Sequence, residues 1–365
     1  MKYVTIAGRQ LDISLAEVYA LFGNAKVKNK HIIEFNTDVK PNIDRMGGSL
    51  KLAEELDVKP MQFLMDLPEG KITLGISDYS SIANRKSTMT EALKLKKIMV
   101  RHGRSVRIVE NKEAALSTAT SLHNGLGGKN ERKIELVKSD GKWYRVIGVQ
   151  DIDAYAKRDQ MRPARDAKVG MLPPKLAQIL INLCGPLNAG AWVLDPFCGT
   201  GVVLQETILM GYKAYGTDIS ERMVEYSKKN LEHYGLDGYR LEKGDATCYR
   251  WDETIDAVAC EGYLGKPFSK IPSEIELKEQ KQECGRIFVG FLKNLASQIR
   301  IGVPVVVAMP AWLRVNAEYE RLFSDKMIDE IENMGYNVVN KSREGLLYHR
   351  DRQAVARDII ILRKK

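Results

Sequence analysis

Apolar and polar positions follow one pattern up to about residue 150 and another after residue 171. In the first part, short apolar runs of strand length alternate with amphipathic stretches of helix length. This pattern predicts strands within residues 1–9 and at 31–35, 71–77, 105–109, 134–138 and 143–149. It predicts helices at residues 15–22, 48–56, 90–102 and 114–122. We therefore expect two small α+β units, at residues 1–62 and 63–150.

After residue 171, apolar strands alternate with longer amphipathic helices. The predicted strands lie at residues 191–194, 213–217, 239–241, 255–259 and 303–308. The predicted helices lie at residues 202–210, 221–233 and 274–299. Such alternation favours an α/β domain with a parallel, doubly wound sheet, in which ligands bind at the carboxyl ends of the strands. We assign this domain to residues 171–365, and we interpret the charged, proline-containing and aperiodic residues 151–170 as a linker or docking segment between the two parts.

Composition excludes several classes of protein. The chain has 365 residues, of which 44% are hydrophobic and 28% are charged, and no apolar run approaches the roughly 18 residues of a membrane span. We therefore expect neither a membrane protein nor a disordered one. The N-terminal residues resemble a strand rather than a secretion signal, which predicts a cytoplasmic location. Five scattered cysteines without a CxxC pair argue against a disulfide framework and a structural zinc site.

The net charge of +9 is concentrated in one segment. Residues 71–150 hold 16 Lys and Arg against 7 Asp and Glu, whereas residues 1–70 hold 9 against 10 and residues 151–365 hold 31 against 30. A basic module beside nearly neutral neighbours is typical of a polyanion-binding appendage, although a solubilising surface is the alternative. The candidate phosphate contacts follow helical spacing on one face and continue past the helix: Lys94, Lys97, Arg101, Arg104 and Arg107.

Acidic residues stand at the predicted ends of three strands. The first strand runs into Asp195-Pro-Phe-Cys-Gly-Thr-Gly201 directly before a helix, Asp218 ends the second, and Asp245 follows the third. Glycines allow a sharp turn and close approach of a ligand, and Asp218 is placed to accept both hydroxyls of a ribose. An acidic residue at the head of the turn would repel phosphate but suits an ammonium group beside a sulfonium. These features point to S-adenosylmethionine.

The turn DPFCGTG, with Asp218 and Asp245, resembles that of class I methyltransferases. The stretch RPARDAKVGMLPPK at residues 162–175, together with the basic front, resembles one family in particular, the THUMP-domain tRNA guanosine-N2 methyltransferases acting on guanosine 10. The resemblance extends to three further segments, residues 47–56, 116–126 and 348–364.

The resemblance implies a Rossmann-like C-terminal methyltransferase domain. It also implies that residues 1–62 form a ferredoxin-like unit and residues 63–150 a THUMP-like RNA-binding domain. Met171 and Leu172, with Asp166 and Gly170, would cover the methionine end of the cofactor. The residues expected to hold S-adenosylmethionine are Asp195, Phe197, Gly199, Gly201, Asp218, Ile219, Asp245, Ala246, Met171 and Leu172. No metal is required.

The fourth strand end carries the candidate catalytic residues. Amino-methylating members of the superfamily have there an acidic or amide residue, two prolines and an aromatic residue. Here the segment reads Cys260-Glu-Gly-Tyr-Leu-Gly265, so Glu261 can accept a hydrogen bond from the target amino group and Tyr263 can stack on the base. Both prolines are missing, and the glycines predict a more flexible loop.

The expected reaction is methyl transfer to N2 of a guanosine in tRNA. Methylation of adenine N6 in DNA or RNA is an alternative, because the chemistry at an amino group is shared. A catalytically degenerate RNA-binding protein is another, because the loop departs from the family's pattern. We expect a monomer that binds tRNA and no membrane, and the resemblance leaves open a small activating subunit like that of eukaryotic members.

Overall fold

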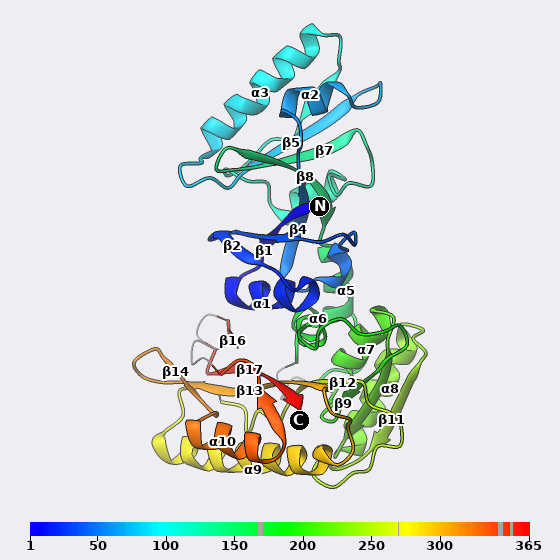
Figure 1. Ribbon diagram of the computed structural model, residues 1–365, viewed down its shortest axis with the longest axis vertical. Coiled ribbons are helices and arrows are strands. Elements are labelled where there is room, and N and C mark those ends of the chain that lie inside the picture. Colours follow the sequence, from blue (N-terminus) through cyan, green and yellow to red (C-terminus); the bar gives the residue numbers. More distant parts are fainter. Residues whose placement is uncertain (167–170, 269, 342–345, 351–352) are drawn as a thin grey trace. The chain divides into compact units, whose positions relative to one another are not determined.

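A computed structural model describes residues 1–166, 171–268, 270–341, 346–350 and 353–365. The chain forms two compact units, Met1–Tyr155 and Ala156–Lys365 (Figure 1). The finer division of the first unit at residue 62 stays a prediction. Among the described helices, none combines the length and the apolar character that a membrane span requires.

The first unit contains one eight-stranded sheet in the order β2-β3-β1-β4-β8-β7-β5-β6. Its strands are β1 (Lys2–Ala7), β2 (Lys26–Asn29), β3 (Ile32–Asn36), β4 (Ser49–Glu55), β5 (Ile72–Asp78), β6 (Val106–Ile108), β7 (Lys133–Ser139) and β8 (Lys142–Val149). Its helices are α1 (Leu11–Phe22), the 3-10 helix η1 (Ile43–Arg45), α2 (Pro60–Met65), α3 (Arg85–Arg101) and α4 (Thr118–His123). Helix α5 (Ile152–Gln160) continues into the second unit. Two apolar clusters anchor helices to the sheet, one under α1 and one under α2 and α3.

One predicted element of this unit is wrong. The helix expected at residues 48–56 is strand β4, which pairs with β1 on one side and β8 on the other. Its Leu, Lys, Ala and Glu residues favour helix locally, but pairing in the middle of the sheet outweighs that weak preference. The ammonium group of Lys51, in this strand, lies 2.5 Å from the carboxylate of Glu135, and both side chains are fully buried.

The second unit contains a nine-stranded sheet whose main order is β11-β10-β9-β12-β13-β17-β15. Its strands are β9 (Trp192–Asp195), β10 (Lys213–Asp218), β11 (Tyr239–Lys243), β12 (Ala257–Glu261), β13 (Pro304–Leu313), β14 (Tyr319–Arg321), β15 (Tyr336–Val338), β16 (Leu346–Tyr348) and β17 (Val355–Lys364). Strands β9 to β13 are parallel, as predicted, but β17 runs antiparallel to β13 and β15 antiparallel to β17. The sheet is therefore mixed rather than wholly parallel.

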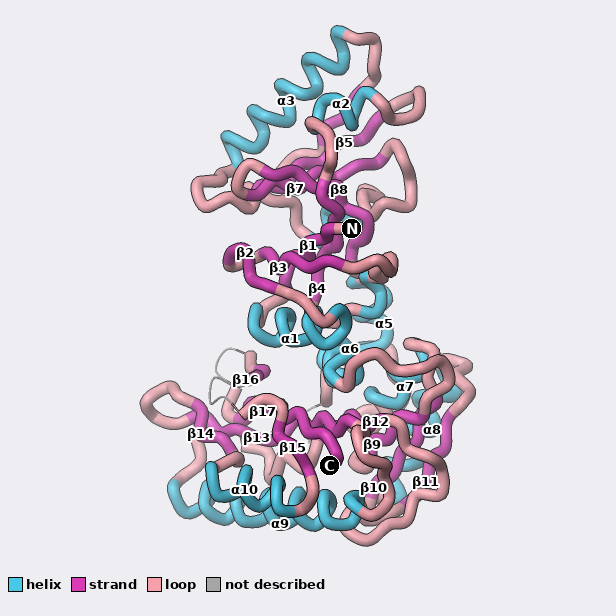
Figure 2. The backbone as a smooth tube through the Cα atoms, in the orientation of Figure 1, coloured by secondary structure: helices cyan, strands magenta, loops and turns pink. Residues whose placement is uncertain are grey.

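Helices cover both faces of this second sheet. They are α6 (Pro174–Leu183), α7 (Val202–Leu209), α8 (Glu221–His233), α9 (Glu274–Ala296) and α10 (Asp325–Asn333). The long helix α9 runs along one face together with α10 (Figure 2), and its Phe288 and Phe291 are buried against strands β9, β12 and β13. Because β10 and β12 leave β9 in opposite directions, the strand order reverses at β9, and such a point is where α/β sheets bind ligands.

The segment predicted as an aperiodic linker is partly regular. Residues 152–160 form α5, and Arg162 and Ala164 are hydrogen-bonded to Thr200 and Asn230 within the second unit. The strong charge of the stretch hid helix α5 in the sequence, and the hydrogen-bond partners of Arg162 and Ala164 lie far away along the chain. Gly170, expected near the cofactor, lies outside the described residues.

Candidate functional site

Four acidic residues end four neighbouring strands and line one cavity of about 460 Å³. Asp195 ends β9, Asp218 ends β10, Asp245 follows β11 and Glu261 ends β12. Because these strands are parallel, their carboxyl ends meet at the same edge of the sheet. The volume is within the range of small-molecule sites.

The turn after β9 depends on two glycines. Gly199 and Gly201 have φ of +52° and +82°, in the left-handed region that favours glycine. A Cβ on Gly201 would lie only 2.9 Å from the hydroxyl of Ser227, so this position also allows α8 to pack closely against the turn. Buried Asp195, at the head of the turn, accepts the N–H of Phe197 at 3.1 Å through Oδ1.

Two backbone N–H groups hold the carboxylate of Asp218 in place. Its Oδ2 accepts the N–H of Gly199 at 2.9 Å, and its Oδ1 accepts the N–H of Ser220 at 2.9 Å. Each carboxylate oxygen can accept about two hydrogen bonds, so both oxygens keep capacity for the hydroxyl groups of a ligand. Asp218 therefore has the geometry of a diol acceptor.

Asp245 stabilises its own loop. Its Oδ1 accepts both the N–H of Thr247 at 2.9 Å and the hydroxyl of Thr247 at 2.7 Å. Asn294 of α9 donates to the carbonyl of Ala246 at 3.0 Å, which fixes the loop from below. Ala246 and Ile219 give this end of the cavity apolar walls, as an adenine ring would require.

Burial of several carboxyl groups together raises their pKa values. Burial raises the pKa of Asp195 well above its ordinary value, and the nearby carboxylates Asp218 and Glu261 raise it further. Burial also raises the pKa of Asp218 and the pKa of Glu261. A cation in the cavity would stabilise the ionised carboxylates. S-adenosylmethionine, with a sulfonium, an ammonium and two ribose hydroxyls, fits this set of groups.

The first part of the loop after β12, residues 262–266, is held in place without prolines. The N–H of Gly262 donates to the carbonyl of Ala308 at 3.0 Å, and the N–H of Lys266 donates to the side chain of Gln280 at 2.7 Å. A Cβ on Gly262 would lie 2.5 Å from the sulfur of Met309. A proline at Gly262 would therefore clash and would also lose a hydrogen bond.

Glu261 has a partner that sequence reasoning missed. Its Oε1 accepts the Nε–H of Arg357 at 2.8 Å, and the two side chains are 16% and 5% exposed. The guanidinium lowers the pKa of Glu261, against the larger opposite effect of burial. The available signal was the Arg-Asp pair at residues 357–358, which interrupts apolar residues in the strand Val355–Lys364.

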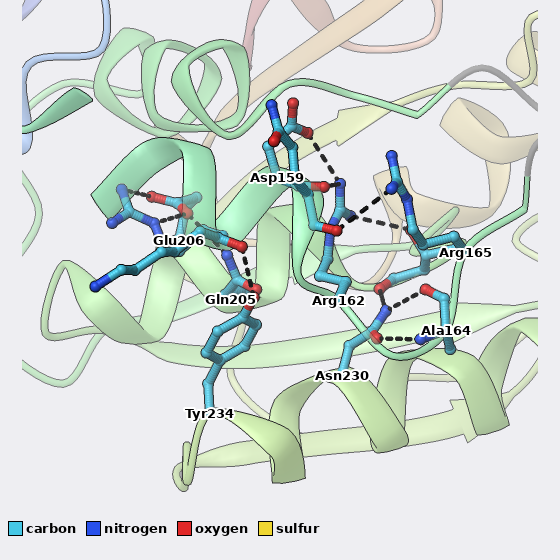
Figure 3. Close-up of polar contacts among 12 residues, drawn as sticks. Asp159, Arg162, Ala164, Arg165, Gln205, Glu206, Asn230 and Tyr234 are labelled. Atoms are coloured by element: carbon cyan, nitrogen blue, oxygen red, sulfur yellow. Dashed lines mark hydrogen bonds and ion pairs between the residues drawn. The ribbon is translucent and has the colours of Figure 1, made fainter. Parts of the chain in front are cut away.

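Residues 157–166 are attached to α7 and α8, as Figure 3 shows. Arg158 donates to the carboxylate of fully buried Glu206 at 2.7 Å, and the hydroxyl of Tyr234 donates to the carbonyl of Lys157 at 3.0 Å. This segment therefore belongs to the second unit and leads directly to Asp166, which lines the cavity.

Asn230 of α8 connects residues 157–166 to the glycine-containing turn after β9 (Figure 3). Its amide accepts the N–H of Ala164 at 3.0 Å and donates to the carbonyls of Ala164 at 3.0 Å and Thr200 at 2.9 Å. Arg162 also donates to the hydroxyl of Thr200, at 3.3 Å. Thr200 belongs to the glycine turn, so these bonds hold the turn from outside the cavity.

The structure brings together the predicted residues of the cavity with one exception. Gly201 lies behind the turn, against α8, rather than on the cavity wall. The predicted residues that line the cavity are Asp166, Met171, Leu172, Asp195, Phe197, Gly199, Asp218, Ile219, Asp245, Ala246, Glu261 and Tyr263. Arg286 and Ile287 of α9 also line it and were not predicted.

The predicted phosphate contacts belong to the first unit. Lys94, Lys97 and Arg101 are exposed on α3. Arg104 is partly buried and donates to the carbonyls of Leu67 and Pro68 at 2.7 and 2.8 Å. Arg107 donates to the side chain of Asn124 at 3.2 Å, in the loop after α4. The α3 residues are therefore the best placed to meet a polyanion.

Two family models match the chain. A model described as a methyltransferase domain matches residues 187–341. A model described as a DNA methylase matches residues 81–229. Both matches include the glycine turn after β9 and Asp218 of β10.

Curated relatives and solved structures give more specific likenesses. The tRNA (guanine(10)-N2)-dimethyltransferase of Methanothermobacter thermautotrophicus is 34% identical over 155 residues, 42% of this chain and 43% of that protein. The protein of the same name from Pyrococcus abyssi is 43% identical over 103 residues, 28% of this chain and 27% of that protein. The matches thus span less than half the length of these two relatives. The structure of TrmN from Thermus thermophilus aligns with 100% of this chain and 99% of that chain at 15% identity and a TM-score of 0.48. These matches confirm the methyltransferase part of the resemblance: residues 187–341 are similar to a methyltransferase domain, and the chain is related to the tRNA (guanine(10)-N2)-dimethyltransferases.

Proposed function

We propose that this protein methylates N2 of a guanosine in tRNA, with S-adenosylmethionine as methyl donor, and that the target is position 10. The observation that carries the proposal is the cavity with Asp195, Asp218, Asp245 and Glu261 at four adjacent strand ends, in a chain related to enzymes named for this reaction.

The cofactor would be held by the first three strand ends. Asp218 accepts the ribose hydroxyls, Asp245 faces the adenine amino group, and buried Asp195 lies nearest the positive charge. Met171 and Leu172 cover the methionine end. When bound, S-adenosylmethionine supplies a methyl group on a sulfonium.

The target base would be held by Glu261 and Tyr263. The carboxylate of Glu261 accepts a hydrogen bond from the exocyclic amino group and turns its lone pair toward the methyl group, while Tyr263 stacks on the flipped base. While the amino nitrogen accepts the methyl group that the cofactor would supply, Glu261 would hold the amino group in place and would receive the proton that this nitrogen loses. A methylated amino group that still carries its extra proton is a strong acid, so a carboxylate is basic enough to take it.

The first unit would deliver the RNA. We propose that residues 1–62 form a ferredoxin-like unit and residues 63–150 a THUMP-like domain, with Lys94, Lys97 and Arg101 contacting phosphates. We also propose that the protein is a monomer in the cytoplasm and that it acts either alone or with a small activating subunit.

Incubation of the full chain with methyl-labelled cofactor and unmodified tRNA transcripts tests the proposal. We expect the label in N2-methylated guanosine on mass spectrometry of nucleosides, and its loss when guanosine 10 is replaced by adenosine. Duplex DNA is the second substrate to compare, because of the match to a DNA methylase model. Label in N6-methyladenine would contradict the proposal, and binding of cofactor and tRNA without any transfer would favour a degenerate RNA-binding protein.

A further inference from the structure

A buried ion pair lies directly behind the candidate catalytic carboxylate. Glu261 ends β12, Arg357 belongs to β17, and strand β13 lies between them. Glu261 is paired with Ala308 in the register of β13, and Arg357 with Pro310, two residues farther toward the cavity edge. The side chain of Arg357 therefore spans β13 to reach Glu261, with 2.8 Å between Nε and Oε1.

Burial of this ion pair has a cost in folding free energy. Moving two charges out of water requires several kcal/mol for each ion in general, and apolar residues of similar volume often serve a sheet equally well. The neighbours of Arg357 in β17 are the buried Ala356 and Asp358, and Asp358 has its own partner in Arg321. Glu261, rather than the adjacent Asp358, is therefore the carboxylate that pairs with Arg357.

Burial makes the ionisation of Glu261 unfavourable, and Arg357 opposes this effect. Asp195 of β9 faces it as a second buried carboxyl, and Asp218 of β10 and Asp245 line the same cavity. Further titratable or charged groups among the described residues are Asp166 and Cys198 on the cavity wall, Cys260 on the same strand, Tyr263 in the following loop, and the exposed Arg286 of α9. Arg357 supplies the buried positive charge at this carboxylate.

Resting on the function proposed above, we infer that Arg357 is a positioning residue. It holds Oε1 of Glu261 and thereby directs the other oxygen, as an ionised acceptor, toward the amino group of the target base. In this protein the ion pair and the bonds of Gly262 and Lys266 replace the stiffness that two prolines provide in the family's pattern.

The first test is the pH dependence of turnover in Arg357→Gln and Arg357→Lys. Because burial persists when the guanidinium is removed, the pKa of Glu261 rises further in Arg357→Gln. We expect kcat with tRNA to fall about tenfold or more at neutral pH, the acid limb of the profile to move to higher pH, and cofactor affinity to stay unchanged. Arg357→Lys should recover part of kcat and of the profile.

Arg363→Gln, on the same strand, is the matched control. The side chain of Arg363 donates to the carbonyls of Gly302 and Cys184, so its loss removes a charge from β17 without touching Glu261. If Arg357→Gln lowers kcat equally at every pH, or if Arg363→Gln shifts the profile by the same amount, Arg357 is structural only and the inference is overturned.

A second readout does not depend on turnover. In protein labelled with carbon-13 at the Glu carboxyl groups, the signal missing from Glu261→Gln identifies Glu261, and its titration should move to higher pH in Arg357→Gln. An unchanged titration overturns the inference even if the enzyme is active. A wild-type protein that transfers no methyl to tRNA overturns the proposed function instead, while the titration still shows whether Arg357 sets the ionisation of Glu261.

Discussion

The carboxylate of Asp218 illustrates how a single residue can be prepared for a ligand by the backbone around it. Both of its oxygens accept N–H groups, from Gly199 and Ser220, so the side chain is oriented before any ribose arrives. An amide has the same shape, but its NH2 group would face a backbone N–H and could no longer accept from a hydroxyl.

Asp218→Asn should therefore weaken binding of S-adenosylmethionine. Loss of acceptor capacity in a partly buried site costs about 1–3 kcal/mol, or roughly a tenfold to hundredfold rise in Kd. Isothermal titration calorimetry measures this directly. Asp237→Asn, at an exposed residue of the second unit, is the control, and equal affinities for both variants would remove Asp218 from the site.

Asp358 follows Arg357 in β17, and its pKa provides a test of how burial affects stability. Burial raises its pKa to about 6, and Arg321 only partly opposes this. Below about pH 4 the group is protonated in the folded and the unfolded chain. Between about pH 4 and 6 only the unfolded chain releases the proton, so the free energy of unfolding decreases as pH rises, and above the folded pKa no further change occurs.

Asp358→Asn should remove this dependence. Two pH units correspond to about 3 kcal/mol, so the stability of the variant relative to the wild type should rise by about 2–3 kcal/mol between pH 4 and 7 and then stay level. Urea unfolding at a series of pH values measures the difference. Exposed Asp329→Asn should show no such trend, and a flat difference for Asp358→Asn would mean that its folded pKa is ordinary.

At the scale of elements, α8 acts as a support for the cofactor turn. Asn230 makes three hydrogen bonds, two to Ala164 and one to Thr200, and its side chain is almost fully buried. One side-chain amide therefore provides hydrogen bonds to the backbone of Thr200 in the turn and to the backbone of Ala164.

Asn230→Ala should affect stability and cofactor binding together. Leaving the N–H of Ala164 and two carbonyls without this partner costs about 2–3 kcal/mol of unfolding free energy. The turn would also lose its outer support, so the Kd for S-adenosylmethionine should rise severalfold at a temperature where the variant is folded. Lys229→Ala, exposed on the same helix, should change neither quantity. Lower stability with unchanged cofactor affinity would show that Asn230 supports the fold and not the site.

An element could be predicted where the residues that determine it lie close together in the sequence. The turn after β9 and the acidic strand ends were predictable because glycines and carboxylates stand next to the strands that place them. Strand β4 was mistaken for a helix because its residues favour helix and only its pairing with β1 and β8 makes it a strand. The partner of Glu261 could not be predicted, because Arg357 lies 96 residues away and reaches it across another strand.

At the scale of the whole molecule, positive charge and the cofactor cavity belong to different units. Residues 71–150 carry 16 basic against 7 acidic side chains, whereas the cavity in the second unit is lined by carboxylates. Affinity for RNA should therefore depend on the first unit and be sensitive to salt, while affinity for the cofactor should depend on the second. Variants in one unit can then change one affinity without the other.

The triple variant Lys94→Ala, Lys97→Ala and Arg101→Ala tests this separation. Each phosphate contact contributes about one unit to the slope of log K against log salt concentration, so the slope for tRNA should fall by about 2 to 3. Affinity for tRNA at low salt should fall about tenfold to hundredfold, with cofactor affinity unchanged. The control removes the same charge from the second unit, at exposed Lys228, Lys229 and Lys326. Long-range attraction of tRNA depends on the total charge of the protein, whereas the salt slope depends on the number of phosphates that the protein contacts. Equal slopes for the two triple variants would therefore show that α3 does not contact the phosphates.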